Sequence, residues 1–144
     1  MGMQTLSERL TAVRFSASMR EFLDEVQPAI IGTTRADGTI QMNPIWYERR
    51  DDEIWINGTG GRKWGQRLAA GTPVTLIMVS PSNMWRWAQI QGVVLDKSFA
   101  GGEDHIDRLS QRYLGTEYAN HQPDDPRLVL RIEPIRITGT IDAE

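Results

Sequence analysis

The sequence contains no cysteine, and this absence removes several chemistries at once. Disulfides, thiolate nucleophiles, cysteine-ligated zinc and iron–sulfur clusters are all excluded. Histidine is also scarce, because His105 and His121 are the only two, and neither lies in a spacing typical of a zinc site. No Gly-x-Ser-x-Gly motif offers a serine nucleophile. We therefore expect no metal site and no catalytic side chain, with both histidines at the surface.

Long apolar runs and a surplus of positive charge are missing as well. The formal net charge of −3 argues against a general nucleic-acid or membrane binder, since such proteins usually carry excess lysine and arginine. Residues 1–13 resemble neither a signal peptide nor a membrane span, so we expect a cytoplasmic location. The length of 144 residues suits one domain over 1–144, with residues 1–27 forming N-terminal helices.

Helix signals are concentrated near the N-terminus. The segments Thr5–Glu8 and Ser18–Glu21 both have the spacing of a capping box, in which a hydroxyl and a carboxylate satisfy free helix amides. After the second box, an apolar stripe at helical spacing is formed by Met19, Phe22, Leu23 and Val26. A further helix is predicted over 102–114, where Glu103 and Asp104 suit the positive end of the helix dipole.

The rest of the chain has the pattern of strands joined by short turns. Strands are predicted at 29–34, 40–48, 53–58, 73–79 and 85–97, with a last one from Leu128. Asp37-Gly38 is typical of a hairpin turn. The apolar parity slips by one residue after Pro134, which indicates a β-bulge. About six strands in hairpin succession predict a mainly β fold, a closed or nearly closed antiparallel barrel.

A glycine-rich turn followed by cations gives the strongest site signal. Thr59-Gly60-Gly61-Arg62-Lys63 runs into a predicted short helix, where two cations are unfavourable beside the helix dipole. They need either a bound anion or full exposure to water. Glycine lets the backbone approach a ligand closely, so the segment favours a phosphate site, with plain exposure as the alternative.

Two further segments carry weaker signals. On the long strand, alternation places Trp85, Trp87 and Gln89 on one face, which suits a subunit interface or the wall of a pocket for a planar ligand. The opposite face, with Ala88 and Ile90, is predicted to be core. Asn43-Pro44-Ile45-Trp46 places a proline inside a strand, which indicates an edge or bulge, either at a site or at a barrel corner.

In their order and spacing these segments resemble the pyridoxamine 5'-phosphate oxidase-like split barrels that bind flavin and deazaflavin. The resemblance extends from Ala29 to Thr138 and is greatest to the small branch of coenzyme F420-dependent enzymes. It implies a six-stranded Greek-key split barrel of the FMN-binding type. It also implies a homodimer, with two cofactor sites at the subunit interface.

The resemblance further implies roles for single residues. Arg62 and Lys63 would hold the cofactor phosphate, next to Gly61. The other residues implied in the cofactor site are Asn57 and Thr59 along the polar tail, Asn43, Pro44, Ile45 and Trp46 facing the ring system, and Trp85, Trp87 and Gln89 closing the pocket from the partner subunit. Flavin-phosphate-binding relatives often have a serine shortly before the lysine. This chain lacks it, which favours F420 over FMN.

The expected function is therefore transfer of a hydride from reduced F420 to a small, conjugated, planar substrate such as an enone, a quinone or a tetrapyrrole. A cofactor of this kind supplies the reactive atom, so the protein has to align it with the substrate and exclude water. Two alternatives stay open. One is an FMN-binding oxidase or flavin reductase, and the other is a non-catalytic module that stores or shields a cofactor or a haem-like ligand.

Overall fold

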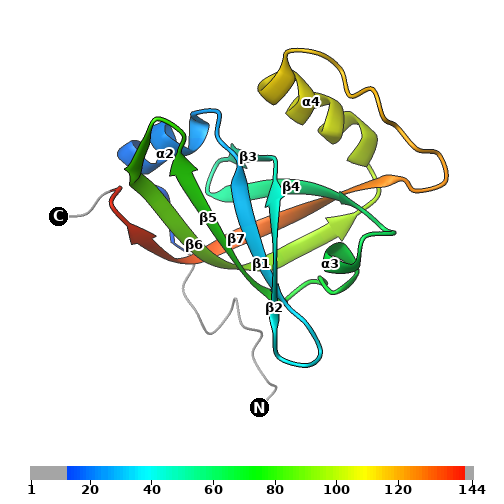
Figure 1. Ribbon diagram of the computed structural model, residues 1–144, viewed down its shortest axis with the longest axis horizontal. Helices are drawn as coiled ribbons and strands as arrows, with labels where there is room; N and C mark the ends of the chain where they lie inside the picture. Colours follow the sequence, from blue (N-terminus) through cyan, green and yellow to red (C-terminus); the bar gives the residue numbers. More distant parts are fainter. Residues whose placement is uncertain (1–12, 142–144) are drawn as a thin grey trace.

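The computed structural model describes residues 13–141 (Figure 1). The helix predicted at Thr5–Glu8 lies outside the described residues. Within them, the elements in chain order are α2 (Ala17–Asp24), β1 (Ala29–Thr34), β2 (Ile40–Ile45), β3 (Tyr47–Arg50), β4 (Glu53–Thr59), α3 (Lys63–Gln66), β5 (Pro73–Ser80), β6 (Asn83–Ser98), α4 (Gly102–Leu114) and β7 (Arg127–Gly139).

The strands form one antiparallel sheet in the order β2-β1-β5-β6-β7-β4-β3. Its two edge strands, β2 and β3, are separated in the chain by Trp46 alone. The sheet must therefore curl until its edges approach each other, as Figure 1 shows. This confirms the mainly β, barrel-like prediction. The predicted strand 40–48 is two strands, because the chain leaves one edge of the sheet at Trp46 and joins the other, which gives seven strands in place of six.

Local sequence signals account for most of the turns. The turn between β1 and β2 contains Gly38 at φ 88°, as the Asp-Gly pair predicts. Helix α2 begins earlier than predicted, because the side chain of Ser16, not Ser18, accepts a hydrogen bond from the Met19 amide. Met19 is buried as expected, whereas Val26 lies beyond the helix and is 52% exposed, so its place in the apolar stripe was wrong.

The predicted bulge near Pro134 is present where β7 pairs with β6. Gln91 faces Arg136 and Gly92 faces Pro134, which leaves Ile135 as the extra residue. A side chain at Gly92 would place its Cβ 2.4 Å from the Glu133 carbonyl oxygen, so only glycine fits there. Leu128, Leu130 and Ile132 point into the core on one side of the bulge, as their alternation predicts.

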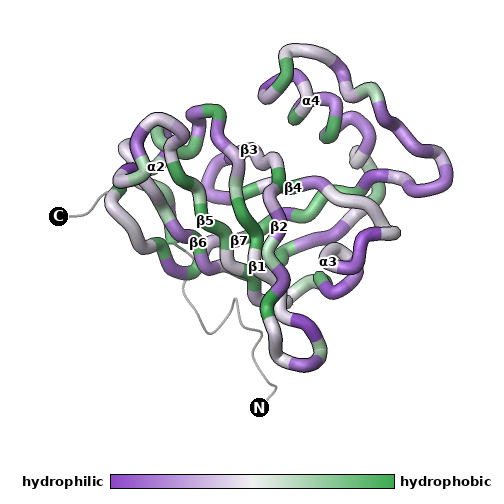
Figure 2. The backbone as a smooth tube through the Cα atoms, in the orientation of Figure 1, coloured by the Kyte–Doolittle hydropathy of each residue, from purple (hydrophilic) through white to green (hydrophobic). Residues whose placement is uncertain are grey.

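The helices lie at the rim of the barrel. Figure 1 shows α4 standing beside β4 and β7, with a long connection returning to the start of β7. In Figure 2 the hydrophobic stretches follow the strands, while the β1–β2 turn is hydrophilic. Within residues 13–141, every helix is too short and too polar to cross a lipid bilayer.

Candidate functional site

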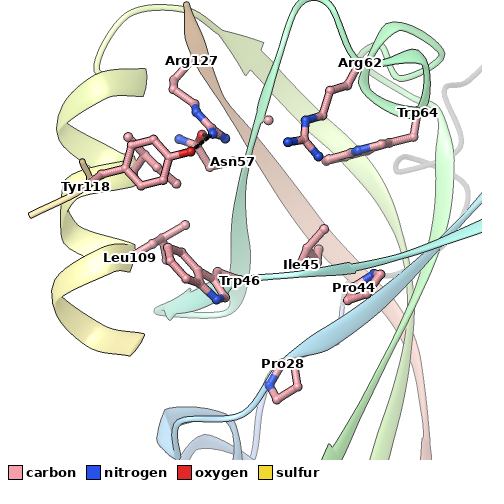
Figure 3. Close-up of a pocket in the computed structure, with 12 residues that line it drawn as sticks. Pro28, Pro44, Ile45, Trp46, Asn57, Arg62, Trp64, Leu109, Tyr118 and Arg127 are labelled. Carbon is pink, nitrogen blue, oxygen red and sulfur yellow. Dashed lines mark hydrogen bonds between the residues drawn. The ribbon is translucent and has the colours of Figure 1, made fainter. Parts of the chain in front are cut away.

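A pocket of about 270 Å³ lies between α4 and the barrel, where the β2–β3 bend faces the end of β4 (Figure 3). Its lining residues are Pro28, Pro44, Ile45, Trp46, Asn57, Gly58, Arg62, Trp64, Ile106, Leu109, Tyr118 and Arg127. Most of these side chains are apolar or aromatic, and a small number of polar groups lie among them. This composition is typical of a site for a ring-shaped ligand.

Trp46 presents a flat apolar surface to the pocket, and its orientation is fixed from behind. Its ring stacks on Tyr113 of α4, with the centroids 5.1 Å apart and the planes within 7°. The Tyr113 hydroxyl donates to the Gln27 carbonyl at 2.6 Å. Next to it, Arg112 donates to the carbonyls of Leu23 and Glu25 at the end of α2. The bend at Trp46 is therefore held between two helices.

Two arginines supply the positive charge of the pocket. Arg62 precedes α3 and is exposed at the mouth, and Arg127 opens β7 and is half-buried. Within residues 13–141, neither guanidinium has a carboxylate within ion-pair distance. Arg127 instead contacts the Tyr118 hydroxyl and lies over the Tyr118 ring, 4.7 Å from its centroid.

Asn57 is buried at the wall of the pocket, and its amide orientation is fixed. The amide nitrogen donates to the Gly102 carbonyl at 3.0 Å and lies 3.1 Å from His105 Nδ1. His105 Nδ1 must accept this bond, so the proton of the neutral imidazole is on Nε2, which is 3.2 Å from Glu48 Oε1. The amide oxygen of Asn57 is left facing Arg127, at 3.5 Å.

Glu48 holds the outer end of this buried chain. Besides His105, its Oε1 contacts Arg108 at 2.7 Å and Arg50 at 3.1 Å. Burial alone would raise the pKa of Glu48, but hydrogen bonds from His105 and Arg108 and the positive charge of Arg108 outweigh it and lower the pKa to about 2. The exposed position predicted for His105 was wrong, because its side chain is only 1% exposed. Glu48 and Asn57 provide the polar partners that make its burial possible.

The glycine-rich turn differs from its prediction in one respect. The Gly61 amide, expected to face a ligand, donates to the Asp125 carboxylate at 2.9 Å. Helix α3 spans only four residues and its N-cap, Arg62, makes no side-chain capping bond. The helix-dipole argument for a phosphate site therefore has little force, since so short a helix carries little dipole. The remaining basis of that site is the position of Arg62 at the pocket.

The structure brings together five of the residues implied by the resemblance: Pro44, Ile45, Trp46, Asn57 and Arg62 all line the pocket. Thr59 is buried next to it on β4, and its hydroxyl has no partner within the described residues. Asn43 is half-buried on β2, while Gly61 and Lys63 are exposed beside Arg62. The roles of these residues in binding stay predictions.

The β6 residues lie elsewhere in the single chain. Gln89 lines a second, open groove of about 410 Å³ on the outer face of β1, β2, β5 and β6. Trp85 is 73% exposed, and Trp87 is half-buried opposite Val79. None of the three lines the first pocket. A role in that pocket would require a second copy of the chain, as the resemblance implies.

Sequence reasoning missed several lining residues, notably Tyr118 and Arg127. Both flank the polar loop between α4 and β7, and no local pattern separates them from ordinary loop residues. Arg127 reaches the pocket because β7 pairs with β4 in a register that places it opposite Thr59. Trp64 carried a usable signal, since an aromatic residue next to two cations is typical of a ligand site as well as of the core.

Most of the chain matches the model of one known protein family. Residues 15–140 match the family model described as pyridoxamine 5'-phosphate oxidase. Comparison with curated proteins gave no match.

Several solved structures have a similar fold. One named F420 reductase is 21% identical, with a TM-score of 0.74 over 83% of this chain and 94% of its own. A conserved hypothetical protein from Mycobacterium tuberculosis is 18% identical, with a TM-score of 0.65 over 94% of this chain and 88% of its own. An FAD and heme binding protein from Mycobacterium smegmatis is 20% identical, with a TM-score of 0.57 over 95% of this chain and 72% of its own.

Proposed function

The chain belongs to the pyridoxamine 5'-phosphate oxidase family, and from that premise we propose that it is an oxidoreductase that uses coenzyme F420. In this proposal, reduced F420 delivers a hydride to a conjugated planar substrate such as an enone, a quinone or a tetrapyrrole. The observation that carries the proposal is that one pocket holds both the Trp46 ring, fixed by Tyr113, and the guanidinium of Arg62, which has no ion pair among residues 13–141. The likeness to a structure named F420 reductase supports it.

The residues present fit a cofactor with a ring and an anionic tail. Arg62 lacks an internal counter-ion among residues 13–141, and the buried Thr59 hydroxyl lacks a hydrogen-bond partner there. A buried hydroxyl without a partner is costly, and a ligand's polar tail is one way to satisfy it. When bound, the deazaflavin supplies the hydride, so no protein base is required.

The chain's own residues would then bind, orient and exclude water. The ring of Trp46, backed by Tyr113, limits the ring system to one plane. Pro28, Ile106 and Leu109 exclude water from the reacting face. Arg62, with Lys63 beside it, would neutralise the phosphate.

We also propose that the working form is a homodimer. The pocket of about 270 Å³ in one chain is slightly smaller than the usual small-molecule site, roughly 300 to 1,000 Å³, and it is open to solvent. A second copy could cover it with Trp85, Trp87 and Gln89, the residues that the single chain leaves outside.

FMN is the second candidate cofactor, because the family model that matches is that of a flavin-type oxidase fold. The haem-binding alternative has less support. Haem iron needs an axial ligand such as a free histidine nitrogen. His105 faces Asn57 and Glu48 with its two nitrogens, and His121 faces Glu103 and Asp107.

The first prediction is direct. The purified chain should bind F420 more tightly than FMN in equilibrium titrations followed by fluorescence, and bound reduced F420 should be oxidised when an enone or quinone is added. Tight FMN binding with no F420 binding would replace the deazaflavin with a flavin. Binding of reduced F420 without hydride transfer to any member of a broad acceptor panel would indicate a carrier module.

A further inference from the structure

Arg127 is positioned to bind an anion that residues 13–141 do not provide. Its guanidinium is half-buried at the pocket, and its partners among these residues are neutral: the amide oxygen of Asn57 and the hydroxyl of Tyr118. Taking a guanidinium partly out of water is unfavourable unless a negative group compensates it. Figure 3 shows Arg127 and Arg62 on the same side of the pocket, above Trp46 and Leu109.

Two other arginines that are partly shielded from water, Arg49 and Arg131, are paired with carboxylates. Arg49 forms two bonds of 2.8 Å to the Asp24 carboxylate. Arg131 binds both oxygens of Glu53, at 2.9 and 2.8 Å. Such forked pairs are the usual way in which a protein compensates a guanidinium. Arg67 and Arg112 are also half-buried and bond only neutral oxygens among residues 13–141, but neither lines the pocket, whereas Arg127 does.

Glu103 contacts the backbone of Arg127, and both of its carboxylate oxygens already have partners. Glu103 accepts the backbone N–H of Arg127 at 2.6 Å, and its other carboxylate oxygen pairs with His121 at 2.6 Å. The guanidinium itself bonds Asn57 and Tyr118, so Glu103 acts on it only through charge at longer range and forms no direct ion pair with it. Its side chain is held in place while its charge remains available to a ligand.

We propose that Arg127 is an anion-binding residue of this pocket and that it holds, together with Arg62, the phosphate of a ring-bearing ligand. The proposal rests on the proposed function for the identity of the ring, but not for the anion. It assigns Tyr118 a positioning role, since its hydroxyl and ring fix the guanidinium. It also explains how the site can bind an anion although Asp125 occupies the Gly61 amide.

Inorganic phosphate tests the anion site without any cofactor. In NMR spectra of the ¹⁵N-labelled full chain, the side-chain N–H signals of Arg62 and Arg127 should shift together and saturate as phosphate is added. Arg136 lies exposed on the same strand as Arg127 and serves as the control, whose signal should not move. An Arg127 signal that fails to respond, or that responds no more than that of Arg136, would overturn the proposal.

A matched pair of flavins then tests the role in ligand binding, because FMN and riboflavin differ only in the phosphate. The measured quantity is the Kd of riboflavin divided by the Kd of FMN. In Arg127→Met this ratio should fall about tenfold or more, because FMN binds more weakly while riboflavin binding is unchanged. Arg136→Met should leave the ratio unaltered. Arg127→Lys, which keeps the charge but loses the fork, should fall between. It also provides the measurement if thermal melting shows that Arg127→Met does not fold.

The outcomes separate the two proposals. A ratio that is unchanged in Arg127→Met and reduced in Arg62→Met would overturn the role of Arg127 while the proposed function stands. If the wild-type chain binds none of FMN, riboflavin and F420, the proposed function fails, and the phosphate titration alone decides the role of Arg127.

Discussion

At the scale of single residues, the pocket wall depends on a buried polar chain that runs from Asn57 through His105 to Glu48. The resemblance implied a place for Asn57 at the site, but nothing in the sequence placed His105 or Glu48 beside it. His105 looked like a surface residue of an ordinary helix, and Glu48 like a charged residue at the end of a strand. Only the packing of α4 against β4 brings them into contact. Burial then makes each polar group dependent on the next.

The buried contacts of Glu48 predict that Glu48→Gln lowers the unfolding free energy by an amount that depends on pH. The folded pKa of Glu48 is about 2, well below its ordinary value of 4.5, so its charge stabilises the fold above pH 4.5 and loses that effect as the pH falls toward 2. We expect the variant to lose about 1 to 3 kcal/mol of unfolding free energy at pH 7, and the loss to shrink steadily toward pH 2. Urea unfolding at several pH values measures both.

The exposed residue Glu21 provides the control for this series, because it makes no ion pair within the described residues. Glu21→Gln should leave the unfolding free energy nearly unchanged at every pH. A Glu48→Gln variant that behaves like this control, or whose deficit is the same at pH 7 and near pH 2, would contradict the stabilising role of the buried chain.

At the scale of elements, the loop between α4 and β7 forms one wall of the pocket and is attached to α4 through His121. Its imidazole lies 2.6 Å from Glu103 and 2.9 Å from Asp107. Hydrogen bonds that His121 donates to Glu103 and then to Asp107 raise its pKa above the ordinary value of 6.5. Asp107 also accepts a hydrogen bond from the Tyr118 amide at 3.0 Å, so the contacts that hold His121 also hold a residue that lines the pocket.

The loop should therefore loosen as His121 loses its proton. A raised folded pKa stabilises the folded loop fully below pH 6.5, and the effect disappears as the pH rises through the folded pKa. We predict that His121→Gln lowers the hydrogen-exchange protection of the Tyr118 amide at pH 6, whereas the two proteins converge in alkaline solution. The exposed neighbour Asn120 supplies the control Asn120→Ala. Equal protection of wild type and His121→Gln at pH 6 would show that the ion pairs do not hold the loop.

The same elements show what the sequence could and could not predict. Alternating apolar residues fixed the strands and even the bulge after Pro134, because parity depends on neighbours in the chain. At Trp46 the sequence predicted an edge or bulge, but not the change from β2 to β3. A proline in a strand indicates an edge, but it does not show which strand the chain joins next. Arg127 was missed altogether, because its place depends on the register between β4 and β7.

At the scale of the whole molecule, the outer face of the sheet is unusually apolar for a surface. Ile40 and Met42 on β2 are 64% and 62% exposed, and Trp85 on β6 is 73% exposed. The groove between β2 and β6 also contains Ile77 and Gln89. Exposed apolar side chains that gather in one place usually mark an interface, and Ile40, Met42 and Ile77 all line this groove. The homodimer proposed above would use this face, and in that proposal the β6 residues of one chain cover the pocket of the other.

This reasoning predicts that Met42→Glu converts a dimer to a monomer. A stable interface buries about 800 Å² on each partner, and a carboxylate at its centre would lose hydration without gaining a partner. The control is Leu114→Glu, since Leu114 is 65% exposed on α4, which packs on β4 and β7 and not on this face. Sedimentation equilibrium should show a dimer for wild type and Leu114→Glu and a monomer for Met42→Glu.

F420 affinity should fall in Met42→Glu alone, because the partner's β6 residues would no longer cover the pocket. A wild-type chain that is monomeric while saturated with cofactor would remove the reason for placing Trp85, Trp87 and Gln89 at the site.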